Sequence, residues 1–220
     1  MTTDLRAFVE PDGHGDRDGT YHVRSLYFDG IDLPCVHDKL EGLPNRYKLR
    51  LRAYINPGQL PAQVKFEIKH RRGELIRKEV TAESLPRYRE LLQDLRSHSL
   101  TQDFRESSSA GLIAFFRLKH LHALLPVWNL QFRRQAFSAL RDRNCRITFD
   151  DGLVGWRAND LFDRTTAPSG PIDRWFHILE IKMATQMPYW LSRLVSKYRL
   201  QRTSVSKYVH VNGPTAGDND

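Results

Sequence analysis

The chain has few cysteines and no long apolar run. Only Cys35 and Cys145 occur in 220 residues, which is too few for a disulfide framework or, by themselves, a zinc site. We expect both to be buried packing residues of a protein in a reducing, cytoplasmic setting. No apolar stretch approaches the roughly 20 residues that a membrane-spanning helix needs, and no signal-peptide pattern follows Met1. The sequence therefore predicts a globular protein without a transmembrane segment.

Common catalytic motifs are also missing. The sequence has no HExxH zinc motif, no P-loop, no Gly-x-Ser-x-Gly elbow and no dinucleotide-binding fingerprint. His120 and His122 lie two apart in a predicted helix, so they do not share a face and do not suggest a metal pair. What stands out instead is charge: 34 Lys and Arg against 26 Asp and Glu, a net charge of +8. This excess predicts an anionic partner, such as a nucleotide, polyphosphate, nucleic acid or an acidic membrane surface.

The basic residues follow the period of a β-strand. Residues 47–54 alternate strictly, and side chains two apart share a face of an extended strand, so Lys48, Arg50 and Arg52 point the same way. Three cations in a row repel each other, which predicts a negative group opposite them. Residues 64–71 repeat the pattern, with one face formed by Lys65, Glu67, Lys69 and Arg71.

Hydrophobic periodicity predicts a strand-rich α+β protein. The expected strands cover about 21–29, 46–55, 63–71, 75–80, 129–137, 145–150, 152–159, 177–183 and 205–211. The expected helices cover about 35–40, 85–95, 110–125 (ended by Pro126) and 188–198. Roughly eight strands in hairpin-like succession favour an antiparallel eight-stranded barrel or a strongly curved sheet with flanking helices. Residues 1–20 are expected to be irregular, 21–212 to form the domain, and 213–220 to be a disordered tail.

Charged residues recur on several other predicted strands. These charged residues include Arg134, Arg146, Glu180, Lys182 and Lys207. Either these faces all lie in water or they converge on a ligand, because lysine and arginine are seldom buried without a partner. Five strands contribute cations and two share a Glu-x-Lys pattern, which favours convergence on an anion.

In chain order, seven short motifs resemble one known family. They are Ser25-Leu26-Tyr27-Phe28-Asp29, Lys48-x-Arg50-x-Arg52-x-Tyr54, Glu67-x-Lys69, Arg134-x-Ala136-Phe137, Arg146-Ile147-x-Phe149-Asp150, Glu180-x-Lys182 and Ser206-Lys207-Tyr208. This series resembles the VTC domain, the catalytic module of polyphosphate polymerases within the CYTH or triphosphate tunnel metalloenzyme superfamily. The resemblance extends from about Tyr21 to Val211.

The resemblance implies an antiparallel tunnel that binds ATP, polyphosphate or triphosphate. Polymerase members transfer the γ-phosphoryl group of ATP to a growing polyphosphate with Mn²⁺ or Mg²⁺. By motif, the catalytic phosphate contacts are expected at Arg50, Arg52, Lys69, Arg134, Arg146 and Lys207. Further phosphate contacts are expected at Lys48, Lys78, Lys182, Ser206 and Tyr54. Glu180 is the expected metal ligand, with Glu67 as the second.

The chain departs from the family at its N-terminus. Family members begin with a strand that has an acidic and basic pair, followed by a helix. No such strand precedes Tyr21, and residues 5–9 resemble the end of that helix. We therefore expect an incomplete tunnel, unless the missing strand is encoded upstream of Met1.

Three functions remain open from the sequence: a polyphosphate polymerase, a triphosphatase in which water replaces the phosphate acceptor, and a module that binds nucleotide or polyphosphate without turnover. Nucleic-acid binding is not expected, because groove binders typically present a basic helix or an exposed aromatic platform.

Overall fold

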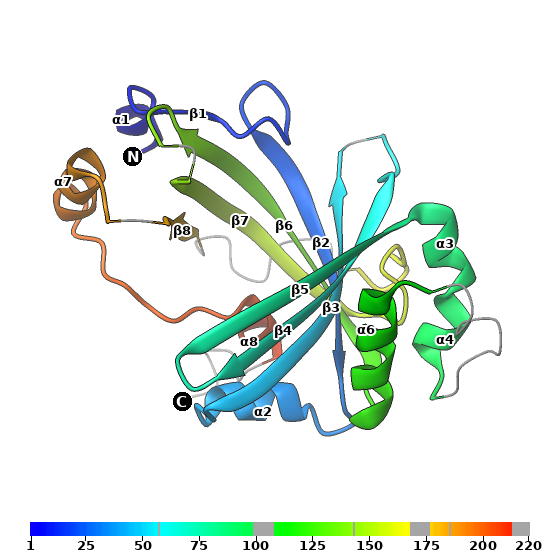
Figure 1. Cartoon of the computed structure of the whole chain (residues 1–220). Coiled ribbons are helices and arrows are strands. Elements are labelled where there is room, and N and C mark those ends of the chain that lie inside the picture. The colour runs from blue at the N-terminus through cyan, green and yellow to red at the C-terminus, as the bar shows by residue number, and fades with distance from the viewer. Residues whose placement is uncertain (57, 99–107, 143, 168–176, 185, 213–220) are drawn as a thin grey trace, which may run out of the picture.

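A computed structural model describes residues 1–56, 58–98, 108–142, 144–167, 177–184 and 186–212. Within them, one antiparallel sheet of eight strands forms the body of the protein (Figure 1). The strands are β1 (Val9–Pro11), β2 (Thr20–Asp29), β3 (Asn45–Ile55), β4 (Gln63–Arg72), β5 (Leu75–Ser84), β6 (Leu125–Ala139), β7 (Arg146–Arg157) and β8 (Ile178–Lys182). Their order is β5-β4-β3-β2-β6-β7-β8, and β1 pairs with β6 beside β2.

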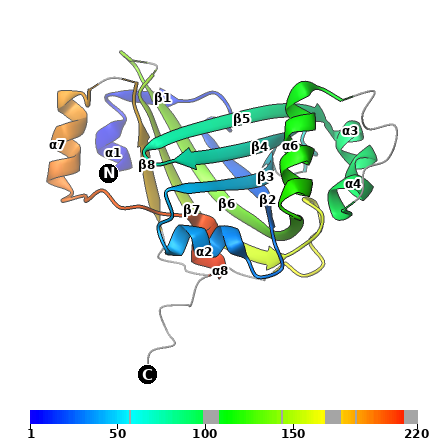
Figure 2. The same cartoon turned by 60° about the horizontal axis from the view of Figure 1, so that its bottom comes forward.

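The sheet curls into a half-barrel. Figures 1 and 2 show the β3–β5 wall and the β6–β8 wall diverging from the centre of the sheet, with β5 and β8 as its two edges. The predicted α+β class and strongly curved antiparallel sheet are confirmed. Among the described residues the two edge strands do not pair with each other, so the sheet does not close into a tunnel.

A large hydrophobic core covers the convex face of β2, β3 and β4. Alternation buries Leu49, Leu51 and Ala53 on this face and leaves the basic residues of β3 on the other. The helices that pack here are α3 (Leu85–Glu90), α4 (Leu92–Arg96) and α6 (Ala110–Leu121). Ser84 begins α3 as its N-cap, since its Oγ accepts a hydrogen bond from the Arg87 backbone N–H.

A separate core lies outside β6, β7 and β8. Here the helices α1 (Thr2–Leu5) and α7 (Tyr189–Lys197) pack against the sheet, with Leu5, Leu191 and Ile147 fully buried. Buried Cys145 belongs to this core, and Cys35 is also buried and unpaired, as predicted. The concave face holds the charged side chains of the strands beside a third apolar cluster, which includes Val23 and Phe132.

The last element contradicts the sequence prediction. Residues 205–211 were expected to form a strand, but Lys207–Asn212 form the helix α8. Val209 and Val211 pack with buried Tyr208 against the concave side of β2 and β6. The helix therefore buries these apolar residues of the segment as a strand would have done. With α2 (Pro34–Leu40), α8 covers one end of the half-barrel (Figure 1).

Other boundaries also differ from the prediction. Residues 1–20 are not wholly irregular, because α1 and β1 occur there, and β1 is a strand before Tyr21; it has Glu10 but no Glu-x-Lys pair. The helix α6 ends at Leu121, and Pro126 lies within β6 where the register with β2 shifts, a bulge that tolerates proline.

The two predicted strands 145–150 and 152–159 are one strand, β7. Gly152, with φ of 62°, lies where the pairing with β6 changes register. The predicted tail 213–220 lies outside the described residues. No described helix is long and apolar enough to cross a membrane.

Candidate anion-binding site

Three lysines lie side by side on the concave face. The strand register places Lys48 of β3 opposite Lys69 of β4, and Lys69 opposite Lys78 of β5. Cross-strand partners have Cβ atoms about 4.5–5.5 Å apart, and like charges in such positions destabilise a sheet. A row of three cations across three adjacent strands therefore requires a compensating negative charge.

Only part of that charge comes from the protein. Burial lowers the pKa of Lys69, and Arg50 lowers it further. Burial also lowers the pKa of Lys48, whose Nζ contacts a neutral partner, the hydroxyl of Ser206, at 2.9 Å. Burial also lowers the pKa of Arg52. Its Nε donates a hydrogen bond to the hydroxyl of Ser25 at 3.3 Å and lies 3.9 Å from the Glu67 carboxylate. The charged form of these three groups is therefore disfavoured in the protein alone, and a bound anion would stabilise it.

Glu67 is the carboxylate that holds this wall together. Its oxygens accept hydrogen bonds from Arg50 Nε at 2.6 Å and from Lys78 Nζ at 2.8 Å. Burial alone would raise the pKa of Glu67, but Arg50 and Arg52 lower it to about 2. Glu67 was predicted as the second metal ligand, and in the structure both of its oxygens accept hydrogen bonds from cations.

The opposite wall has its own ion-pair cluster. Arg134 donates two hydrogen bonds to the Asp150 carboxylate, from Nε at 2.6 Å and Nη2 at 2.8 Å. Lys207 of α8 reaches the same carboxylate at 2.7 Å. Both Arg134 and Asp150 are buried. This cluster attaches α8 to β6 and β7, and it explains how a helical residue joins a site that otherwise consists of strands.

Glu180 of β8 is the accessible carboxylate of this wall. Lys182 lies 3.3 Å and Arg134 3.6 Å from its oxygens. Burial would raise the pKa of Glu180, but Lys182 and Arg134 lower it, so Glu180 is ionised at neutral pH. The Glu180 carboxylate also counteracts the lowered pKa of Lys69. Charges on the two walls therefore interact electrostatically across the concave face.

The remaining predicted residues lie at the margins. Arg146 is engaged by Asp12 and by the hydroxyl of Tyr21. Lys65 lies 4.7 Å from the ring of Tyr54. The predicted residues Lys182 and Ser206 thus contact Glu180 and Lys48. Burial would raise the pKa of Tyr54, but the neighbouring Arg52 lowers it, so Tyr54 adjoins the site, whereas Arg146 is engaged by Asp12 and Tyr21.

The described residues hold no group of three or more His, Cys, Asp or Glu side chains that could form a protein-only metal cage. Mg²⁺ usually takes one or two carboxylates and completes its shell with water and substrate phosphates, and Glu180 suits that role. Thr148 lies directly opposite Glu180 in the register of β7 and β8. Its buried hydroxyl has no hydrogen-bond partner in the described structure, which leaves an oxygen for such a shell. The donor set therefore fits a metal held largely by its substrate.

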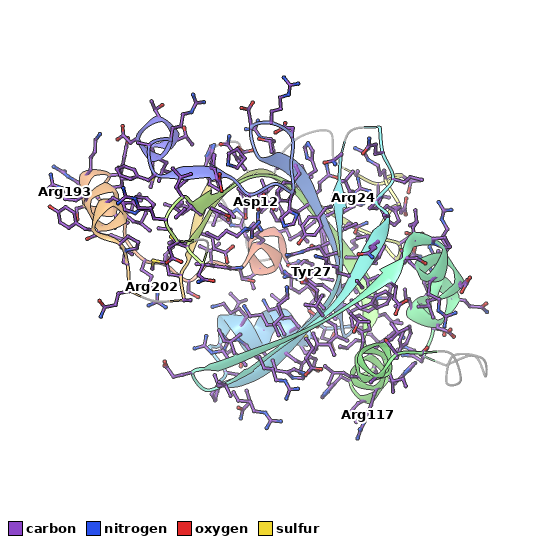
Figure 3. The ribbon with its side chains drawn as sticks, turned by 45° about the horizontal axis from the view of Figure 1, so that its top comes forward. Asp12, Arg24, Tyr27, Arg117, Arg193 and Arg202 are labelled. Atoms are coloured by element: carbon purple, nitrogen blue, oxygen red, sulfur yellow. The ribbon has the colours of Figure 1, made fainter. Side chains whose placement is uncertain are left out.

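Tyr27 was not among the predicted site residues. Its hydroxyl accepts a hydrogen bond from Arg50 Nη1 at 2.9 Å, and its ring stacks on Tyr208 with centroids 4.5 Å apart. Figure 3 shows Tyr27 near the centre of the molecule. Burial would raise its pKa, but Arg50 and Arg52 lower it to about 8. Asp150 and Thr148 were likewise not predicted as site residues, although they alternate with Arg146 in the sequence, which is the signal that could have found them.

We expect one tyrosine of the protein to ionise near pH 8. An ultraviolet titration of the wild type should show this early phenolate absorbance, and Tyr27→Phe should lack it. Bound tripolyphosphate should raise the pKa of Tyr27, because the anion offsets the cations that lower it. A titration curve unchanged by Tyr27→Phe, with all tyrosines ionising near their ordinary pKa of about 10, would contradict this placement.

Fold and site together define a class: a half-barrel with under-compensated cations on its concave face. The VTC domain family matches residues 1–212, and the chain belongs to this family. No curated protein matches the sequence significantly. Among solved structures, a crystal structure titled a "putative adenylate cyclase" from Bacillus halodurans matches with a TM-score of 0.52 and 12% identity, over 88% of this chain and 82% of that one. This likeness supports the fold, and the resemblance inferred from the motifs is confirmed.

Proposed function

We propose that the protein is a polyphosphate polymerase-like phosphotransferase that binds ATP and polyphosphate on the concave face. The observation that supports this most is the row formed by Lys48, Lys69 and Lys78. Phosphates supply the missing negative charge along such a row. Family membership supports a phosphate compound as the ligand.

The basic residues have separate tasks in this proposal. Lys48, Lys69 and Arg52 neutralise phosphate oxygens directly, because their charges are poorly compensated. Arg50 is held in place by Glu67 and Tyr27 and presents the rest of its guanidinium to the ligand. Phosphoryl transfer depends mostly on positioning and charge neutralisation, so these residues supply the kind of help that the reaction needs.

The reaction is a phosphoryl transfer between oxygen atoms. A terminal phosphate oxygen of the chain forms a bond to the γ-phosphorus of ATP, the bond from that phosphorus to the β–γ bridging oxygen breaks, and ADP leaves. Mn²⁺ or Mg²⁺, when bound, neutralises charge on the phosphates. Glu180, with the hydroxyl of Thr148 opposite it, would hold that ion.

Binding without turnover is the second candidate function. Both oxygens of Glu67 are engaged by cations, and β5 and β8 are unpaired edges in the described sheet. If Glu180 supplies the carboxylate for a metal without help from Glu67, the half-barrel would bind phosphates well and position a metal less firmly.

Incubation with ATP and Mn²⁺, followed by gel and phosphorus NMR analysis, separates the candidates. The polymerase proposal predicts long-chain polyphosphate and ADP, and Glu180→Gln should abolish this product while tripolyphosphate still raises the melting temperature. Orthophosphate as the product would instead identify a triphosphatase. Stabilisation by tripolyphosphate without any product would identify a binding module. If the protein forms no long-chain polyphosphate, forms no orthophosphate and is not stabilised by tripolyphosphate, both candidate functions are wrong.

A further inference from the structure

A stretch of the chain from the end of β8 to the end of α8 lacks acidic residues. No Asp or Glu occurs in the 32 residues from 181 to 212, where the average of 26 in 220 would place about four. We call residues 187–206, which comprise α7 and its connection to α8, the basic arm. Its cations are Arg193, Lys197, Arg199 and Arg202. A long segment with charge of one sign indicates a surface for a partner of opposite charge.

The arginines of the basic arm are exposed and uncompensated. Arg193, Arg199 and Arg202 are exposed, and within the described residues none of them forms an ion pair. Lys197 is paired with Asp4, the carboxylate that α1 brings to this helix. Exposed arginines without an ion pair also occur elsewhere among the described residues, such as Arg89 and Arg117, so the distinguishing feature of the basic arm is that its unpaired cations follow one another in a stretch without any acidic residue.

The basic arm connects two parts of the anion site. It follows β8, which presents Lys182, and it leads into α8, which presents Lys207 to Asp150. Near its end, Ser204 and Ser206 accept hydrogen bonds from Lys39 and Lys48. Figure 1 shows the connection running past the open side of the half-barrel, and Figure 3 shows Arg193 and Arg202 on the side opposite Arg117. Cations therefore continue from the concave face onto the outside.

The chemistry of α7 disfavours a membrane as its partner. An amphipathic helix that enters a membrane interface must present its apolar face to lipid. Leu191 and Leu194 of α7 are instead buried against α1 and the sheet. The accessible surface of the arm combines its cations with scattered exposed side chains such as Tyr189 and Leu200, and the buried leucines leave α7 without a free apolar face for lipid. This surface suits a flexible, highly charged chain.

We propose that the basic arm binds the part of a long inorganic polyphosphate chain that extends beyond the half-barrel. This inference rests on the proposed function, since it takes the polymer from the same site. The concave face then holds the reacting end, while the arm holds later phosphates through charge. Such a surface increases affinity for long chains and leaves affinity for short ones unchanged.

The test compares two double variants that remove equal charge. Arg193→Gln/Arg202→Gln alters the basic arm, and Arg89→Gln/Arg117→Gln removes two exposed arginines from α3 and α6. Dissociation constants are measured for tripolyphosphate and for long-chain polyphosphate over a range of salt concentrations. The arm variant should bind the long chain about tenfold more weakly, with a salt slope smaller by roughly 1.4, as two lost phosphate contacts imply for a single-stranded polyanion. It should bind tripolyphosphate like the wild type, and the control variant should match the wild type for both ligands.

Three results would overturn the inference. The first is equal weakening of long-chain binding by both variants, or by neither. The second is a proportional loss of tripolyphosphate affinity in the arm variant, which would place these arginines in the main site. The third is tighter binding of anionic vesicles or of a single-stranded oligonucleotide through the same arginines. Failure of the proposed function is distinguishable, because the wild type would then form no long-chain polyphosphate from ATP, whereas the arm is tested by binding alone.

Discussion

Lys69→Gln is expected to weaken tripolyphosphate binding by about 10- to 100-fold without lowering the stability of the free protein. A hydrogen bond to a charged group contributes roughly 1.5–3 kcal/mol, which corresponds to this loss of affinity. Lys69 lies between Lys48 and Lys78 in the register, and burial and Arg50 lower its pKa. Removing this charge therefore relieves repulsion in the free protein. Titration calorimetry and urea denaturation measure the two effects.

Arg77→Gln is the matched control for Lys69→Gln. Arg77 precedes Lys78 in β5, so its side chain points to the other face of the sheet, where it is exposed and pairs with Glu79. Both substitutions remove one positive charge from the same wall, and Arg77→Gln should leave tripolyphosphate affinity within roughly twofold of the wild type. Equal affinity losses in both variants would mean that net charge, not the concave face, determines binding. A large loss of stability in Lys69→Gln would mean that its charge is well compensated.

Asp150→Asn is expected to lower the free energy of unfolding by about 3–5 kcal/mol. The substitution removes the shared partner of Arg134 and Lys207 and leaves a buried guanidinium without its carboxylate. It also weakens the attachment of α8 to the sheet, so residues near Tyr208 should become more accessible to hydrogen exchange. Urea denaturation of both proteins at neutral pH measures the change.

Asp151→Asn provides the comparison for Asp150→Asn. The next residue in the chain pairs with Arg133 at the surface, and such a pair contributes about 0–1 kcal/mol.

The pKa of Asp150 is lowered by Arg134 and Lys207 in spite of burial. Its stabilising effect is therefore complete above the unfolded pKa of about 3.9 and disappears as the pH falls below that value. Similar effects of the two substitutions, or a loss for Asp150→Asn that does not diminish in acid, would contradict the buried cluster.

Much of the sheet follows from alternation alone. The strands around Lys48 and Lys69 were predicted within one residue, because one apolar face and one charged face leave a single way to place them on a core. The convergence of these cations on one surface was also predictable, since the period of two fixes the face of each residue. Register was not predictable, and it is register that places Lys48, Lys69 and Lys78 in one row.

The role of each charged residue could not be obtained from the pattern. Glu67 and Glu180 occupy the same Glu-x-Lys motif, yet the first is enclosed by Arg50 and Lys78, and the second stays accessible. Their difference arises from neighbours that are distant in sequence. Contacts with residues distant in sequence also explain why α8 was wrongly predicted as a strand. Its six residues have a short apolar pattern that suits a strand or a helix. The helix packs Tyr208 on Tyr27, a contact that the local pattern does not reveal.

The central claim is that the cations of the concave face, with Tyr27 beside them, form a binding site for a phosphate anion. Calorimetric titration of the wild type with tripolyphosphate at about pH 9, in two buffers of different ionisation enthalpy, tests it most directly. Binding should be accompanied by proton uptake, because the anion raises the lowered pKa values of Lys48, Lys69 and Tyr27. Absence of binding, or binding without proton uptake, would contradict this account of the site.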